Sequence, residues 1–323
     1  MHELAQNGDV MAAVLSFAGC LRDVAAMRAC CRSWVKDLLN PLHQATAHLF
    51  QRIEERFNQS VSDKCIQSSF ATEALRVLQL TGCRSVTDVG VAWLATLAPC
   101  LEFLDLSRCD RVSDYGLHYV AAHCKLLVSL DISHLPRMTD QNGLAKFIAC
   151  PQLRQINVTQ TAAGNYGLST VAMYSSLLES IFGCRTNVGG TGLRNIATFC
   201  PQLQQLHLDD CSNAYNYGAT AIGEHIQDYT QDSNNVALPT NDHINDQSLA
   251  VLARRCPLLR VLEIAHAGDV TDEGVMALGH TCRRLERLNL WGCNKVTFSA
   301  VNSLQLSGIE VSHPQARTCR FAI

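Results

Sequence analysis

Leucines recur along the chain at a fixed interval, in copies of the pattern L-x-x-L-x-L. The steps between the first leucines of successive copies are 26, 26, 26, 25, 25, 56 and 26 residues. A constant period of this length indicates a repeat architecture in which each copy is one structural unit. The first leucines are Leu75, Leu101, Leu127, Leu153, Leu178, Leu203, Leu259 and Leu285.

Each unit has two halves with different periodicity. The L-x-L part alternates between apolar and polar positions, which is typical of a strand. In the second half of the first unit, Thr87 or Asp88 can cap a helix, and Val91, Leu94 and Ala95 follow at helical spacing. A single strand–turn–helix unit cannot cover its own apolar face, so neighbouring units must stack. The sequence therefore predicts an α/β solenoid with curved parallel strands inside and helices outside.

The step from Leu203 to Leu259 is the main irregularity. Two helix-like stretches, at 216–226 and 244–256, flank a polar segment. Either a degenerate unit or an inserted loop accounts for the extra length. Since 56 is about one 26-residue unit plus 30 residues, we expect a hidden unit with a slightly long loop, and an irregular region at 216–248.

Most of the 16 cysteines follow the repeat, and they do not form metal or redox motifs. No C-x-x-C pair occurs, and most cysteines lie either just after a strand or just before the next first leucine. A free cysteine in such a turn behaves as a compact apolar side chain. We therefore expect no metal site and no cofactor.

The stretches "LRVLQLTGCRSVTDVGVAWLATLAPC" (75–100) and "LRVLEIAHAGDVTDEGVMALGHTC" (259–282) resemble the cysteine-containing class of leucine-rich repeats. The resemblance covers 75–311, about eight or nine units. The fourth unit lacks the cysteine and the Thr-Asp cap. In the fifth, Gly183 and Cys184 are out of phase, and in the eighth Phe298 replaces the capping Asp.

The first forty residues break the period and predict two short helices. "VLSF" and "LRDVAAMRACCRSW" resemble an F-box, although the usual opening Leu-Pro is absent. Without that resemblance, the segment would simply be a helical cap on the solenoid. We expect an F-box-like segment at 1–40, a helical linker at 41–74 with the apolar stripe Leu49, Ile53 and Phe57, the repeats at 75–311 and a tail at 312–323.

Membership of the F-box/leucine-rich-repeat family would imply a Skp-type adaptor and a cullin ubiquitin ligase as partners. Apolar side chains of the F-box would enter the helices of the adaptor, and aromatic anchors dominate such interfaces. Carried over by motif position, the contacting residues would be Val14, Leu15, Phe17, Leu21, Val24, Met27, Cys31 and Trp34.

Strand residues that point away from the leucines would form the concave floor of the solenoid. They are mostly polar, include four carboxylates and predict a slightly acidic groove with Trp291 near its C-terminal rim. This surface is the expected site for a protein partner. Its residues are Gln79, Asp105, Asp131, Asn157, Phe182, His207, Asp209, Glu263, Asn289 and Trp291.

Composition and motifs exclude several other functions. A net charge of -3 without a block of basic residues argues against nucleic acid as a partner. The apolar stretch at 10–21 is too short to span a membrane and follows no Lys or Arg, so we expect no signal peptide and a cytoplasmic location, with the nucleus or a cilium as alternatives. No catalytic motif occurs, and His207 beside Asp209 lacks a nucleophile in motif context.

The resemblance implies a non-enzymatic subunit, the substrate receptor of an SCF-type cullin ubiquitin ligase that holds its target on the concave surface. The alternative is a structural scaffold subunit of a large assembly such as the ciliary dynein regulatory complex, with axonemal or other scaffold proteins as partners. Recovery of the adaptor and cullin with the chain would separate the two.

Overall fold

The computed structural model describes residues 61–69, 75–211 and 242–314. Within these ranges, nine short strands form a single parallel sheet whose order follows the sequence. The strands are β1 (Val77–Gln79), β2 (Phe103–Asp105), β3 (Ser129–Asp131), β4 (Gln155–Asn157), β5 (Ser180–Phe182), β6 (Gln205–His207), β7 (Val261–Glu263), β8 (Arg287–Asn289) and β9 (Glu310–Ser312).

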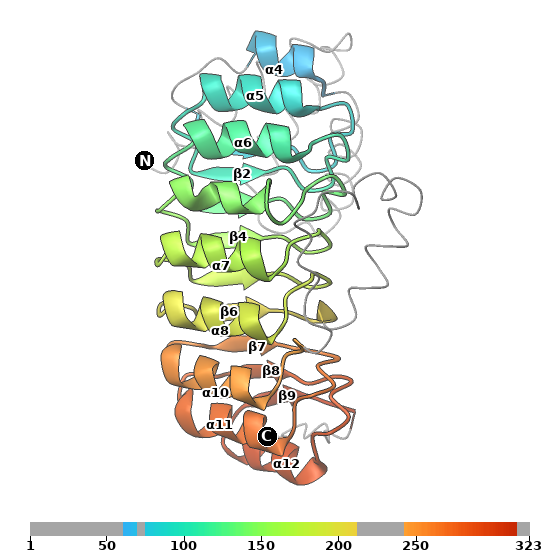
Figure 1. Ribbon diagram of the computed structural model, residues 1–323, viewed down its shortest axis with the longest axis vertical. Coiled ribbons are helices and arrows are strands. Elements are labelled where there is room, and N and C mark those ends of the chain that lie inside the picture. Colours follow the sequence, from blue (N-terminus) through green and yellow to red (C-terminus); the bar gives the residue numbers. More distant parts are fainter. Residues whose placement is uncertain (1–60, 70–74, 212–241, 315–323) are drawn as a thin grey trace, which may run out of the picture.

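A layer of helices stacks along one side of this sheet, and both layers follow the long axis of the molecule (Figure 1). Each helix packs on the helices of the neighbouring units. The described helices are α4 (Asp63–Ser69), α5 (Asp88–Leu97), α6 (Asp114–His123), η1 (Leu144–Ala149, a 3₁₀ helix), α7 (Asn165–Tyr174), α8 (Gly190–Phe199), α10 (Asp246–Arg255), α11 (Asp272–Thr281) and α12 (Phe298–Leu306).

The strands pair so that equivalent residues of each unit are neighbours. Leu78 lies beside Leu104, and Leu104 beside Leu130. The same register continues to the last pair, Leu288 and Val311. Because side chains alternate between the two faces of a strand, one face of the sheet is a continuous apolar ladder and the other carries the polar positions.

The apolar ladder and the inner faces of the helices form one continuous core. All eight first leucines of the repeat are buried, and so are helix residues such as Val91, Leu94 and Ala95. A unit has no core of its own, since the apolar face of each strand is covered only when its neighbours are in place. The predicted α/β solenoid of leucine-rich repeats is confirmed.

The two residues of the Thr-Asp pair at the start of α5 have separate roles. Thr87 is the N-cap of α5, and its hydroxyl oxygen accepts a hydrogen bond from the backbone N–H of Val89 at 3.2 Å. Asp88 reaches the next unit instead, where its carboxylate accepts from the backbone N–H and the hydroxyl of Ser113 at 2.7 and 2.6 Å. Of the two residues that the sequence allowed as cap, Thr87 is the one used.

The fourth unit keeps this connection with a different residue. The N-cap of its helix α7 is Gly164, which has no capping side chain, but Asn165 occupies the position of the aspartate. The amide oxygen of Asn165 accepts hydrogen bonds from the backbone N–H groups of Gly189 and Gly192 at 2.8 and 3.0 Å. The bond between units therefore depends on an oxygen acceptor at this position and not on the full Thr-Asp sequence.

Most of the described cysteines are buried between units, as predicted. Cys109 donates its S–H to the carbonyl of Leu80 in the preceding unit at 3.1 Å. In the unit without a cysteine, the hydroxyl of Ser175 donates to the carbonyl of Cys150 at 3.2 Å. Burial raises the pKa of the Cys256 thiol to about 12, so these thiols remain neutral.

The hidden unit expected between Leu203 and Leu259 is not present in the sheet. β6 pairs directly with β7, with Leu206 beside Leu262, and α8 packs directly on α10. The described part of this unit ends at Cys211, in the turn after β6, and resumes at Asp242, before the regular helix α10. The extra residues are therefore inserted between the turn and the helix of one unit, and residues 246–248, expected in the irregular region, belong to that helix.

Candidate interaction surface

The face of the sheet that points away from the helices, here called the open face, collects all ten residues predicted for the groove. Eight of them are register partners on successive strands and form one column, while Asp209 and Trp291 lie two residues further along their chains. The column runs through Gln79, Asp105, Asp131, Asn157, Phe182, His207, Glu263 and Asn289.

Two neighbouring carboxylates of the open face are held by neutral donors. Asp105 accepts from the backbone N–H of Ser107 at 2.8 Å and from the hydroxyl of Thr81 at 2.6 Å. Asp131 accepts from the backbone N–H of Ser133 at 2.9 Å and from the side-chain amide of Asn157 at 2.8 Å. Neither carboxylate forms an ion pair with another described residue, so both contribute unpaired acidic groups to the open face that can attract a partner.

A third carboxylate, Asp209, connects three units. One oxygen accepts from the backbone N–H of Ala265 at 2.6 Å, and the other from the side-chain amide of Asn289 at 3.0 Å. Burial raises the pKa of Asp209, and the nearby charge of Glu263 raises it further. The hydrogen bonds from Ala265 and Asn289 oppose this shift. The carboxylates of the open face are thus fixed in position before any partner arrives.

Next to Asp209, an aromatic ring and a histidine stack. The rings of Phe182 and His207 are 4.6 Å apart and nearly parallel, and Nδ1 of His207 lies 2.6 Å from the Glu263 carboxylate. Nε2 of His207 is buried and has no partner among the described residues. Cys184 lies nearby, but burial raises its pKa to about 11, so it is a poor nucleophile at neutral pH.

The sequence analysis missed a third column on the open face. It lies two residues before the middle column, and the same alternation that selected Gln79 and Asp105 could have identified it. This column adds the apolar Val77 and the aromatic Phe103 at the N-terminal end of the open face, and the cationic Arg287 at its C-terminal end. Its members on β1 to β8 are Val77, Phe103, Ser129, Gln155, Ser180, Gln205, Val261 and Arg287.

Trp291 is 54% exposed, whereas the other two aromatic residues of the open face, Phe103 and Phe182, are half-buried. Its backbone N–H donates to the side-chain oxygen of Asn289 at 3.1 Å, which fixes the backbone while leaving the indole accessible. An exposed, positioned tryptophan is the kind of anchor that dominates protein interfaces.

The residues predicted to contact an adaptor lie outside the described residues, and so does the apolar stripe of the linker. Among the described residues, no group of three or more His, Cys, Asp or Glu side chains is placed to hold a metal ion. In the same part of the chain, no helix has the length and apolar character that crossing a membrane requires.

Comparison with known proteins finds relatives that each match only part of this chain. A family model described as "Leucine Rich repeat" matches residues 255–279. The F-box protein MAX2 homolog A of Petunia hybrida is 26% identical over 36% of the chain, F-box/LRR-repeat protein 4 of Bos taurus is 25% identical over 45%, and Antagonist of mitotic exit network protein 1 of Candida glabrata is 33% identical over 32%.

These matches span about a fifth of each relative's length, namely 23%, 19% and 20%. A chain of the yeast Rad7–Elc1 complex aligns with 94% of this chain at 17% identity and a TM-score of 0.41, too low to add to the argument. Together, the repeat match and the relatives named as F-box proteins support the resemblance to F-box/leucine-rich-repeat proteins that the sequence predicted.

Proposed function

We propose that this chain, a leucine-rich-repeat protein with F-box relatives, is the substrate-binding subunit of an SCF-type cullin ubiquitin ligase. The F-box-like segment at 1–40 would hold the Skp-type adaptor, and the open face would hold the target protein. Ubiquitin transfer would be carried out by other subunits, because the role of this chain is to bind and position.

The observation that supports this proposal best is the open face itself. Its carboxylates are fixed by hydrogen bonds from neighbouring units, and its aromatic groups, Phe103, Phe182 and Trp291, are spread along its length. A rigid, polar surface with separated aromatic anchors suits recognition of a protein, since little ordering entropy is lost when the partner binds.

The adaptor part of the proposal can be tested separately from the target. Full-length chain is co-expressed with a Skp-type adaptor and a cullin, and compared with a Phe17→Ala/Trp34→Ala variant and with Phe50→Ala, a control that removes an aromatic ring outside the F-box-like segment. We expect the adaptor and cullin to be recovered with the wild type and the control and lost from the double variant.

Recovery of axonemal or other scaffold proteins without adaptor or cullin would favour the alternative, a structural subunit of a stable assembly. In that case the open face would be covered permanently by a neighbouring subunit. The two outcomes differ in composition of the recovered complex, so a single purification distinguishes them.

A further inference from the structure

The edge of the sheet where the strands begin has an uneven distribution of charge. In the earlier units this edge carries two ion pairs, Arg76 with Glu102 and Arg154 with Glu179, and one lysine, Lys125, whose Nζ donates to the carbonyl of Ala121. In the last three units arginines accumulate there. We call this group the arginine edge, and it consists of Arg255, Arg260, Arg283, Arg284 and Arg287.

All five arginines of this edge are exposed, and the local acids cannot neutralise them. Glu286 is held by both Nε and a terminal nitrogen of Arg260, at 2.9 and 3.1 Å. Glu310 lies beside Arg287 in the sheet register but forms no ion pair with it. Within the described residues, Arg255, Arg283 and Arg284 also have no side-chain partner. The five arginines of the edge therefore face only two acids, Glu286 and Glu310, which leaves a surplus of three positive charges.

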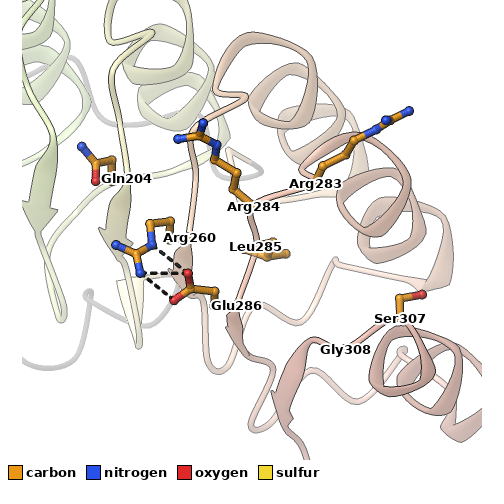
Figure 2. A pocket seen from close by; sticks show the side chains of 8 residues that line it. All are labelled: Gln204, Arg260, Arg283, Arg284, Leu285, Glu286, Ser307 and Gly308. Carbon is orange, nitrogen blue, oxygen red and sulfur yellow. Dashed lines mark hydrogen bonds and ion pairs between the residues drawn. The ribbon is translucent and has the colours of Figure 1, made fainter.

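Three of the arginines line one shallow pocket of about 450 Å³. Figure 2 shows Arg284 extending toward Gln204 and Arg260, whereas Arg283 extends in the opposite direction from the same turn. Leu285, Glu286, Ser307 and Gly308 complete the lining. In this pocket the Arg260 guanidinium is paired with Glu286 and the Gln204 amide donates to Glu179, which leaves the guanidinium of Arg284 as the unpaired donor for an anionic oxygen.

Helix stability alone does not explain this accumulation. Basic residues near a helix C-terminus interact favourably with the helix dipole. However, Arg283 and Arg284 lie beyond the end of α11 at Thr281. The equivalent turns after α5, η1, α8 and α10 carry a proline, and within the described residues only the turn after α6 also carries a basic residue, the single Lys125. The excess of arginines over acids lies in the last three units, as expected for a local binding surface.

We propose that the arginine edge binds an acidic segment of a partner protein, with Arg283 and Arg284 as its main contacts. The planar guanidinium matches a carboxylate in a two-point hydrogen bond, which suits Asp and Glu side chains. A long polyanion would continue onto the open face and meet Asp209 and Glu263, whose charges would repel it. A short acidic segment can stay on the edge, outside the surface proposed for the target.

The test uses the full-length chain and a fluorescein-labelled peptide of eight glutamates, with binding followed by fluorescence anisotropy. We expect an Arg283→Glu/Arg284→Glu variant to weaken binding at least about tenfold. An Arg111→Glu/Arg137→Glu control changes the charge equally at exposed residues of the opposite edge, where the turns lie, and should bind like the wild type. Binding should also weaken between 50 and 200 mM salt.

Circular dichroism of each variant checks that it is folded. No binding by the wild type, or equal weakening in both variants, would overturn the proposal. A single-stranded DNA of 20 nucleotides serves as a second probe. If it binds more tightly than the peptide and with the same dependence on Arg283 and Arg284, a polyphosphate is the ligand and the assignment to an acidic protein is wrong. None of these outcomes depends on an adaptor.

Discussion

The carboxylate of Asp88, at the start of one helix, accepts hydrogen bonds from both the backbone N–H and the hydroxyl of Ser113, the N-cap of the next helix. It also accepts from the backbone N–H of Gly116 at 3.0 Å. The same arrangement recurs between Asp63 and Thr87, and between Asp246 and Thr271. One side chain thus satisfies several free N–H groups of its neighbour, and this links each unit to the next.

Removal of this carboxylate should weaken the solenoid. We expect Asp88→Ala to lower the free energy of unfolding by about 1–3 kcal/mol, because buried donors of the next unit lose their acceptor. Asp88→Asn should cost less, since Asn165 fills this role naturally in the fourth unit. Urea unfolding measures both. Equal losses for the two substitutions would show that the acceptor oxygen is not what matters.

The glycine of the T-D-x-G pattern is required by this close contact. A Cβ at Gly274 would lie 2.4 Å from a carboxylate oxygen of Asp246 and 3.0 Å from its Cα. We expect Gly274→Ala to destabilise the protein by about 1–3 kcal/mol. Gly268 of the same unit has nothing within 4 Å of the added carbon, so Gly268→Ala is the matched control and should change the melting temperature little. A neutral Gly274→Ala would contradict the proposed packing.

Burial of the thiols makes stability depend on alkaline pH. The pKa of Cys256 is raised from an ordinary value of 9.0 to about 12, mainly by burial. In the unfolded chain the thiol loses its proton near pH 9, whereas the folded chain retains it, so the free energy of unfolding falls as pH rises through this window. Part of that fall should disappear in Cys256→Ala.

The comparison is made by urea unfolding of wild type and Cys256→Ala from pH 8 to pH 10.5. The difference between the two curves should be constant at the lower end and shrink as pH rises. A constant difference over the whole range would mean that the thiol is not shielded from ionisation by burial.

The direct pairing of β6 with β7 predicts that residues 212–241 can be removed. Replacing them with a Gly/Ser linker of about ten residues should change the free energy of unfolding by no more than about 1 kcal/mol, because closing a loop of moderate length has a small entropic cost. Circular dichroism and urea unfolding check this. Loss of the cooperative transition would show that the insertion is an integral unit after all.

The regular parts of the fold were predictable because each local signal agrees with its neighbours. Leu78, Val91 and Leu94 repeat at equivalent positions in most units, and burial of all three requires stacking. The cysteines were predictable for the same reason, since their positions follow the repeat. The polar residues of the open face followed from alternation about the leucines.

The rest depends on geometry that the repeat pattern does not specify. A length of 56 residues between Leu203 and Leu259 allows either a hidden unit or an insertion, and only the pairing of Leu206 with Leu262 distinguishes them. The roles of Thr87 and Asp88 could not be separated from sequence, because the partner of Asp88 lies 25 residues away. The arginine edge combines residues from separate turns, none of which forms a recognisable motif.

The central claim is that the open face binds a protein target. Its most direct test is quantitative affinity purification of the full-length chain with Asp105→Lys/Asp131→Lys, whose carboxylates are neighbours on β2 and β3. Asp110→Lys/Glu273→Lys is the control, with the same charge change at exposed residues of a turn and a helix. We predict that proteins bound by the wild type and the control are depleted at least about tenfold from the open-face variant, while the variant remains folded. Recovery of the same proteins in equal amounts with all three chains would contradict the account.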